Sequence, residues 1–273
     1  MLKPFLLALA LLLPAGTQAE PARTISELLN ASGVDVSYGR LGDVMANGAG
    51  TVGLSIDATS AWRRAALAAF DGGLVIDQLV RALQARHTME DFSAAASFFD
   101  SALGRRVTLA ENAAQKITDD AMVKAEGGAI LARLMQEDPA RLALYRRMVE
   151  DSGLLESALA STMSMNLAMV TGMQASGLLP YSMSQDEMIA MLNDQRGAIA
   201  TELERSIYIQ AAFTYAEISD ADMQAYADFL TGPVGRDFYA ALNIAISEVL
   251  NARARDFGEI FAGGDHAPTA NGV

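Results

Sequence analysis

The sequence predicts an all-α protein, a helical bundle of two pseudo-equivalent halves related by internal duplication. Three observations support this prediction. The body of the chain is dominated by Ala, Leu, Met, Glu and Gln, which are strong helix formers, and proline is rare in it. Apolar residues recur three and four positions apart, and no convincing run of alternating β-branched residues interrupts them. A motif in the first half of the chain also returns in the second half.

The first 19 residues are typical of a cleavable secretory signal. Lys3 provides the positive charge, residues 5–13 form an unbroken apolar run, and Ala19 is the small residue that signal peptidase requires. A run of nine apolar residues is too short for a membrane anchor, because a spanning helix needs about 20 residues. We therefore expect cleavage after Ala19 and a periplasmic location.

After the signal, the elements are expected in two halves, residues 20–153 and 154–262, followed by a flexible tail over 263–273. Residues 36–56 contain five glycines, which predict a loop or a broken helix. Apolar periodicity predicts helices over residues 62–83, 129–135, 142–149, 199–213 and 233–261. Pro233 suits the start of the last helix, because the first helical turn does not use its missing N–H.

The repeated motif spans residues 88–105 and returns over residues 219–236, at a constant separation of 131 residues. Each copy has a hydroxyl residue, an aspartate three positions later, a phenylalanine, and then a Gly-Arg pair. The motif residues are Thr88, Asp91, Phe98, Gly104 and Arg105 in the first copy, and Ser219, Asp222, Phe229, Gly235 and Arg236 in the second.

Elementary helix chemistry explains the motif. The hydroxyl residue and the aspartate form a variant of the capping box, which satisfies free N–H groups at a helix start. The phenylalanine is expected in the core, and the glycine at a tight junction between two helices, where a side chain would clash. The arginine starts the next helix, where its charge opposes the helix dipole, so we expect a carboxylate partner for it. The alternative is that Arg105 and Arg236 line a ligand site.

These residues carry a resemblance to a known family. A phenylalanine-rich helix, then Ser-x-x-Gly-Arg or Gly-Pro-x-Gly-Arg, then a long helix, resembles the family called domain of unknown function 2059. The second copy, residues 218–238, is the closer match, although Leu230 and Gly232 stand where the family has tyrosine and serine. The resemblance implies an exported, helical bacterial protein, and it implies no activity for any residue of this chain.

Composition excludes several classes of function. The chain has a formal net charge of −13 and no cysteine. It therefore lacks the excess of cations that nucleic-acid binding needs, and it has no thiol chemistry or cysteine-ligated metal. Residues 48–53 match the glycine pattern of dinucleotide-binding proteins, but no credible strand precedes them, so a loop is expected. His87 and His266 are too few for a catalytic triad or a zinc site, so no cofactor and no metal are expected.

The most unusual stretch lies between Glu156 and Asp186, where the sequence has no charged residue. Met165, Met169 and Met173 are four positions apart in it, so they share one face of the predicted helix. We expect this face to be buried in the core or to form an adaptable apolar groove, with the polar residues of the stretch at a helix interface or on the far side. Thioethers also suit Cu(I), but no histidine or cysteine accompanies them.

Two classes of function remain. The preferred one is a binding or structural module, with no membrane span in the mature chain, that contacts an envelope protein, a peptide, an apolar ligand or a second copy of itself. Its expected contact is the face of Met165, Met169 and Met173. The alternative is a peptidoglycan-cleaving enzyme similar to lytic transglycosylases, with Glu156 as general acid, because Glu156-Ser157 and the later Gly-Met-Gln segment echo those enzymes. The stretch between these two segments lacks the aromatic residues usual in such enzymes.

Overall fold

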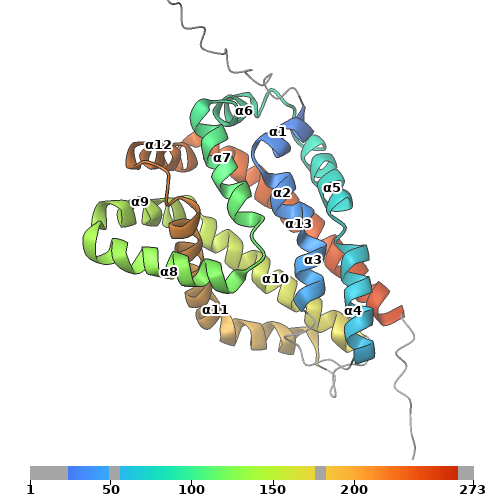
Figure 1. The fold of residues 1–273 in the computed structure, drawn as a ribbon. Coiled ribbons are helices and arrows are strands. Elements are labelled where there is room, and N and C mark those ends of the chain that lie inside the picture. Colours follow the sequence, from blue (N-terminus) through green and yellow to red (C-terminus); the bar gives the residue numbers. More distant parts are fainter. Residues whose placement is uncertain (1–23, 49–55, 176–182, 264–273) are drawn as a thin grey trace, which may run out of the picture.

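The computed structural model describes residues 24–48, 56–175 and 183–263, and within these ranges it contains helices and no strand. The all-α prediction is therefore confirmed (Figure 1). The predicted signal, the tail from residue 264 and most of the glycine pattern at 48–53 lie outside the described residues. In chain order the helices are α1 (Ile25–Ala31), α2 (Val34–Gly39), α3 (Leu41–Asn47), α4 (Ile56–Ala69), α5 (Gly72–Gln84), α6 (Ser93–Phe99), α7 (Ala102–Gln115), α8 (Asp120–Glu137), α9 (Pro139–Glu150), α10 (Leu154–Ala175), α11 (Gln185–Thr214), α12 (Asp220–Thr231) and α13 (Pro233–Gly263).

The single helix predicted over residues 62–83 is wrong, because two helices cover this range. α4 ends at Ala69, and the Asp71 carboxylate then accepts a hydrogen bond of 2.9 Å from the backbone N–H of Leu74 and caps α5. Gly72 is needed at this break, because a Cβ there would lie 2.1 Å from the backbone oxygen of Gly39. The apolar spacing runs through the break unchanged and therefore could not reveal it.

The other predicted helices lie within longer ones, α8, α9, α11 and α13. Of the glycine-containing range 36–56, the described part consists of the end of α2, α3 and the first residue of α4, which is the broken helix among the two expectations. Gly33 and Gly153, which precede α2 and α10, have positive φ values of 75° and 72°. Both positions therefore favour glycine, because other residues rarely adopt this conformation.

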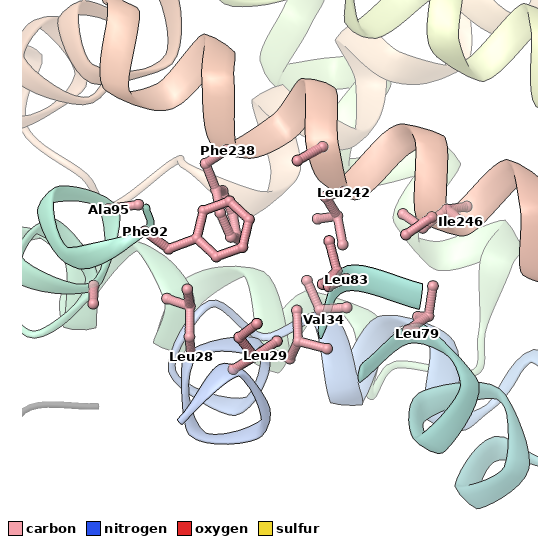
Figure 2. Close-up of a cluster of buried hydrophobic side chains, with 14 of the residues drawn as sticks. Leu28, Leu29, Val34, Leu79, Leu83, Phe92, Ala95, Phe238, Leu242 and Ile246 are labelled. Atoms are coloured by element: carbon pink, nitrogen blue, oxygen red, sulfur yellow. The ribbon is translucent and has the colours of Figure 1, made fainter. Parts of the chain in front are cut away.

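The last helix, α13, crosses the middle of the molecule and packs against α4, α5, α6, α10 and α12 (Figure 1). Figure 2 shows one core cluster at this helix, where Phe238, Leu242 and Ile246 face side chains of α1, α2 and α5. The C-terminal part of α13 forms a second cluster, in which Phe257 and Phe261 pack edge-on against the buried Trp62 of α4. These apolar contacts fix the two ends of α13 against the N-terminal helices.

A third core cluster joins α7, α9, α11 and α12. Each of the three clusters contains residues from both sides of Leu154, the boundary expected between the halves. The two halves therefore share their cores rather than each enclosing a core of its own.

Candidate functional site

The two motif glycines have the same local geometry. A Cβ on Gly104 would lie 2.1 Å from the carbonyl oxygen of Phe98, and a Cβ on Gly235 would lie 2.2 Å from the carbonyl oxygen of Phe229. Gly104 lies in the first turn of α7 and Gly235 in the first turn of α13, so in each case the end of the preceding helix presses against the glycine. Any larger residue would force these backbones apart.

The two motif phenylalanines lie against each other. The rings of Phe98 and Phe229 stack with 3.6 Å between centroids and 4° between planes. Each short motif helix also packs against the long helix of the other motif, since α6 contacts α13 and α12 contacts α7. The motifs therefore meet face to face in the middle of the molecule.

The expected capping box is divided between the two motifs. The Ser219 hydroxyl accepts a hydrogen bond of 3.2 Å from the backbone N–H of Asp222 and caps α12. In the first motif the Asp91 carboxylate instead accepts from the backbone N–H (2.7 Å) and hydroxyl (3.1 Å) of Thr88, which lowers the pKa of Asp91. α6 begins only after this turn, with Phe92 at its N-cap position. Thr88 therefore starts a separate turn rather than α6 itself.

The two motif arginines have no shared role in the described contacts. Arg105 is half-buried and Arg236 is exposed, and the ion pairs found among the described residues include neither. The cation that links the motifs is the next residue, Arg106, whose guanidinium nitrogen lies 3.0 Å from an Asp222 carboxylate oxygen. Both partners of this pair are partly exposed, so it contributes little to stability.

Glu156 is exposed in the first turn of α10. A small hollow between α10 and α13 lies farther along the helix and has room for about one water molecule. Its lining residues are Ser161, Ser164, Ser247, Leu250, Asn251 and Ala254. Glu156 is not among them, and its exposure offers no sheltered pocket for a glycosidic oxygen.

The methionine face can be located only by its backbone. Met165, Met169 and Met173 lie in α10, but their side chains lie outside the described part of the structure, so their inward orientation stays a prediction. Neighbouring polar residues are placed. Ser161 and Ser164 face α13 across the hollow, which is the helix interface expected for polar residues of this stretch.

Two polar contacts join α10 to its neighbours. The Asn243 amide of α13 donates a hydrogen bond of 3.0 Å to the Ser157 hydroxyl. At the other end of α10, the Gln174 amide pairs with the backbone of Met183, donating to its carbonyl (2.9 Å) and accepting from its N–H (2.8 Å). A complete capping box formed by Ser184 and Glu187 then starts α11. α10 and α11 therefore form a hairpin with a defined turn.

The most concentrated polar chemistry of the described residues lies in the third core cluster. A single carboxylate oxygen of Glu111, on α7, accepts hydrogen bonds from the hydroxyls of Tyr215 (2.6 Å) and Tyr226 (2.8 Å). Tyr215 is the residue that ends α11, and Tyr226 lies on α12. Both tyrosines are buried, so Glu111 joins three helices at a point that is largely shielded from water.

A buried arginine holds the same corner from the other side. The Arg141 guanidinium donates to the backbone carbonyl of Tyr215 (2.7 Å), to the Asp220 carboxylate (2.8 Å) and to the Tyr145 hydroxyl (3.1 Å). Its side chain is 6% exposed, whereas that of Asp220 is 67% exposed. Tyr215 is therefore fixed by Glu111 through its side chain and by Arg141 through its main chain.

Burial determines the ionisation of this cluster. Burial raises the pKa of Glu111, and the hydrogen bonds from Tyr215 and Tyr226 act in the opposite direction. Burial and the negative charge of Glu111 raise the pKa of both tyrosines well above their usual value, and they also raise the pKa of Tyr239 on α13. The tyrosines therefore remain hydrogen-bond donors, and Glu111 is the group of this cluster that can change charge near neutral pH.

Sequence reasoning missed this cluster, although the repeat contains a signal for it. The separation of 131 residues pairs Glu111 with Leu242, and Leu242 is buried in the first core cluster. It also pairs Tyr226 with Ala95, another buried residue of that cluster. A carboxylate and a hydroxyl thus replace two apolar core residues, and such a replacement marks a position with a special role.

The remaining sequence candidates form no further site. His87 packs its ring against Phe92, and His266 lies outside the described residues. Among the described residues no group of three or more His, Cys, Asp or Glu is arranged to hold a metal ion. The same residues include no helix that is long and apolar enough to cross a membrane.

Comparisons with protein-family models, with curated proteins and with solved structures find no match to this chain.

Proposed function

We propose that this chain is an exported helical protein of a bacterial-type cell envelope that binds an envelope protein, a peptide or an apolar ligand. The observation that carries the proposal is α10, one continuous helix without a charged residue after Glu156, in a chain of net charge −13. A long uncharged helix in an acidic protein must cover its apolar side chains, either in the core or with a partner. The face of Met165, Met169 and Met173 is the proposed contact, because methionine adapts to partners of different shape.

We further propose that the chain contains two copies of one helical unit, as in the family called domain of unknown function 2059. Beyond the motif, Ser32-Gly33 and Ser152-Gly153 are 120 residues apart, and both glycines have positive φ at the start of a helix. The helices before them bury residues at the same three positions, Ile25, Leu28 and Leu29 in one copy and Tyr145, Met148 and Val149 in the other.

The packing between the copies is reciprocal, which supports this duplication. The first core cluster combines α1 and α6 with α13, and the third combines α9 and α12 with α7. In a twofold arrangement of two units, each contact occurs twice with the partners exchanged, as is found here. The copies differ most after Gly33 and Gly153, where the first continues in short helices and the second in the hairpin of α10 and α11. A segment that differs between copies is where a special function is expected.

The binding proposal is tested with two methionine variants of the full chain. Met169→Glu places a charge on the proposed face, whereas Met135→Glu places one on α8 at a side chain that is already 64% exposed. We expect Met169→Glu to lower the melting temperature or to abolish self-association and binding of an apolar fluorescent dye, because a buried unpaired charge is costly. Met135→Glu should leave these properties unchanged. Equal behaviour of the two variants would show that the face is solvated.

Export and the enzymatic alternative have separate tests. Mass spectrometry of the chain from an envelope fraction should find Glu20 at the N-terminus, and an intact Met1 would contradict export. In a gel containing cell-wall material the protein should produce no cleared zone. Clearing that disappears in Glu156→Gln, and persists in a control variant of the equally exposed Glu126, would establish the transglycosylase-like enzyme instead.

A further inference from the structure

The corner between α11 and α12 is held by a hydrogen-bond network with one removable proton. Glu111 receives both tyrosine hydroxyls on one oxygen, 2.6 Å and 2.8 Å away, so its second oxygen is the site for a proton. Glu111 is half-buried and its two donors are almost fully buried. A carboxylate in such surroundings exchanges a well-solvated charge for two hydrogen bonds, and this exchange makes the charged form unfavourable.

The groups around Glu111 do not neutralise its charge. From α11, α12 and α13 it is faced by the hydroxyls of Tyr215, Tyr226 and Tyr239, which are uncharged at neutral pH. From α9 the Arg141 guanidinium reaches the corner but donates to the Tyr215 carbonyl, Asp220 and Tyr145.

The other elements near α7 also bring no free cation to Glu111. On α7 itself, Arg106 pairs with Asp222 of α12. From α2, the Ser37 hydroxyl accepts from Gln115 one turn farther along α7, and it does not titrate. α6 contributes aromatic side chains to the adjoining core. The described contacts of Glu111 therefore consist of neutral donors.

We propose that Glu111 is a proton-operated lock, which holds α7 to the corner between α11 and α12 when protonated and loosens that corner when it loses its proton. The corner carries the hairpin of α10 and α11, because Tyr215 is the last anchored residue of α11 before the chain turns into α12. A change at Glu111 therefore reaches the hairpin directly. The lock does not depend on what the hairpin binds.

The direction of the pH effect follows from the raised pKa of Glu111, whose ordinary value is 4.5. The folded state holds this proton more tightly than the unfolded chain does. Its stabilising contribution is therefore complete below pH 4.5 and is lost as the pH rises through the pKa of the folded state. Each pH unit between the two pKa values changes the folding equilibrium constant about tenfold.

The test is denaturant unfolding of the full chain between pH 4 and pH 8, compared with Glu111→Gln. Glutamine keeps an acceptor oxygen for the tyrosines and cannot ionise. We expect the folding equilibrium constant of the wild type, relative to that of Glu111→Gln, to fall about tenfold for each pH unit between the ordinary pKa and the pKa in the folded protein. A difference that is constant over this range, or that rises with pH, would overturn the lock.

A second variant keeps the proposal testable if Glu111→Gln does not fold. Tyr226→Phe removes one hydrogen bond that favours the charged carboxylate, so the midpoint of the Glu111 titration should move to higher pH. Carboxyl carbon NMR of glutamate-labelled protein measures this midpoint. Amide hydrogen exchange over residues 212–220, compared between wild type and Tyr226→Phe at the same pH, should report the earlier locking. An unchanged midpoint in Tyr226→Phe would contradict the proposal.

Discussion

Phe98 and Phe229 are 131 residues apart in the chain, and their rings stack face to face with 3.6 Å between centroids. They occupy the same position in the two copies of the motif. A residue meets its own counterpart in this way only where a twofold axis passes between them. The stacked pair is therefore the point at which the proposed duplication has its simplest geometric expression, and it gives the first prediction.

Phe98 and Phe229 should be energetically coupled. Replacement of either ring by alanine removes the same stacked contact, so the second replacement should cost less than the first. A double-mutant cycle should give a coupling free energy of about 0.5–1.5 kcal/mol, the range for aromatic pairs. Chemical denaturation of the four proteins measures it. Strictly additive costs would show that the two rings contribute independently.

The motif glycines give a second prediction. Gly104→Ala and Gly235→Ala should each destabilise the protein by about 1–3 kcal/mol, because the new Cβ would meet a carbonyl oxygen 2.1 Å or 2.2 Å away. The two costs should be similar, since the local geometry is the same.

Gly128→Ala is the matched control for this pair. Gly128 lies inside α8, and a Cβ there would meet nothing within 4 Å. This change should stabilise the protein by about 0.5–1 kcal/mol through helix propensity alone. Thermal unfolding of the three variants decides the matter, and motif variants that melt like the wild type would refute the tight junction.

Local sequence signals predicted the helical class and the special positions of Gly104 and Gly235. They depend on interactions within a few residues of each other, such as apolar spacing and the approach of one helix end to the next helix. They did not predict the break before Gly72, because the apolar periodicity of α4 continues into α5. The helix cap at Asp71 was the signal available there.

The Glu111 network could not be predicted from local pattern, because its partners lie 104 and 115 residues away along the chain. Glu111 alone is an ordinary residue of a helix rich in alanine. Its role becomes visible only when it is compared with Leu242, its counterpart in the repeat. The orientation of Met165, Met169 and Met173 also depends on packing between distant helices, which helical spacing alone does not determine.

Arg141 gives a third prediction. Arg141→Met should cost about 1–3 kcal/mol, because it leaves the buried carbonyl of Tyr215 and the hydroxyl of Tyr145 without their donor. Arg106→Met is the control, since its ion pair with Asp222 is partly exposed and should be worth less than about 1 kcal/mol. Urea unfolding measures both. Equal costs would show that Arg141 does not hold the corner between α11 and α12.

The last prediction concerns the end of α13, where Trp62 is the only tryptophan of the chain. Its indole N–H donates a hydrogen bond of 2.7 Å to the backbone carbonyl of Met45, and its ring centroid lies 4.7 Å from that of Phe257. Trp62 and Phe257 are almost completely buried, so Phe257→Ala leaves a cavity beside the indole. The expected cost is about 3–5 kcal/mol, and the tryptophan emission should shift to longer wavelength as water reaches the ring. Ile260→Ala on the same helix removes a side chain that is 44% exposed and should change both quantities little. Fluorescence and thermal unfolding of the two variants distinguish a sealed cluster from a frayed helix end, since a frayed end would make the two variants alike.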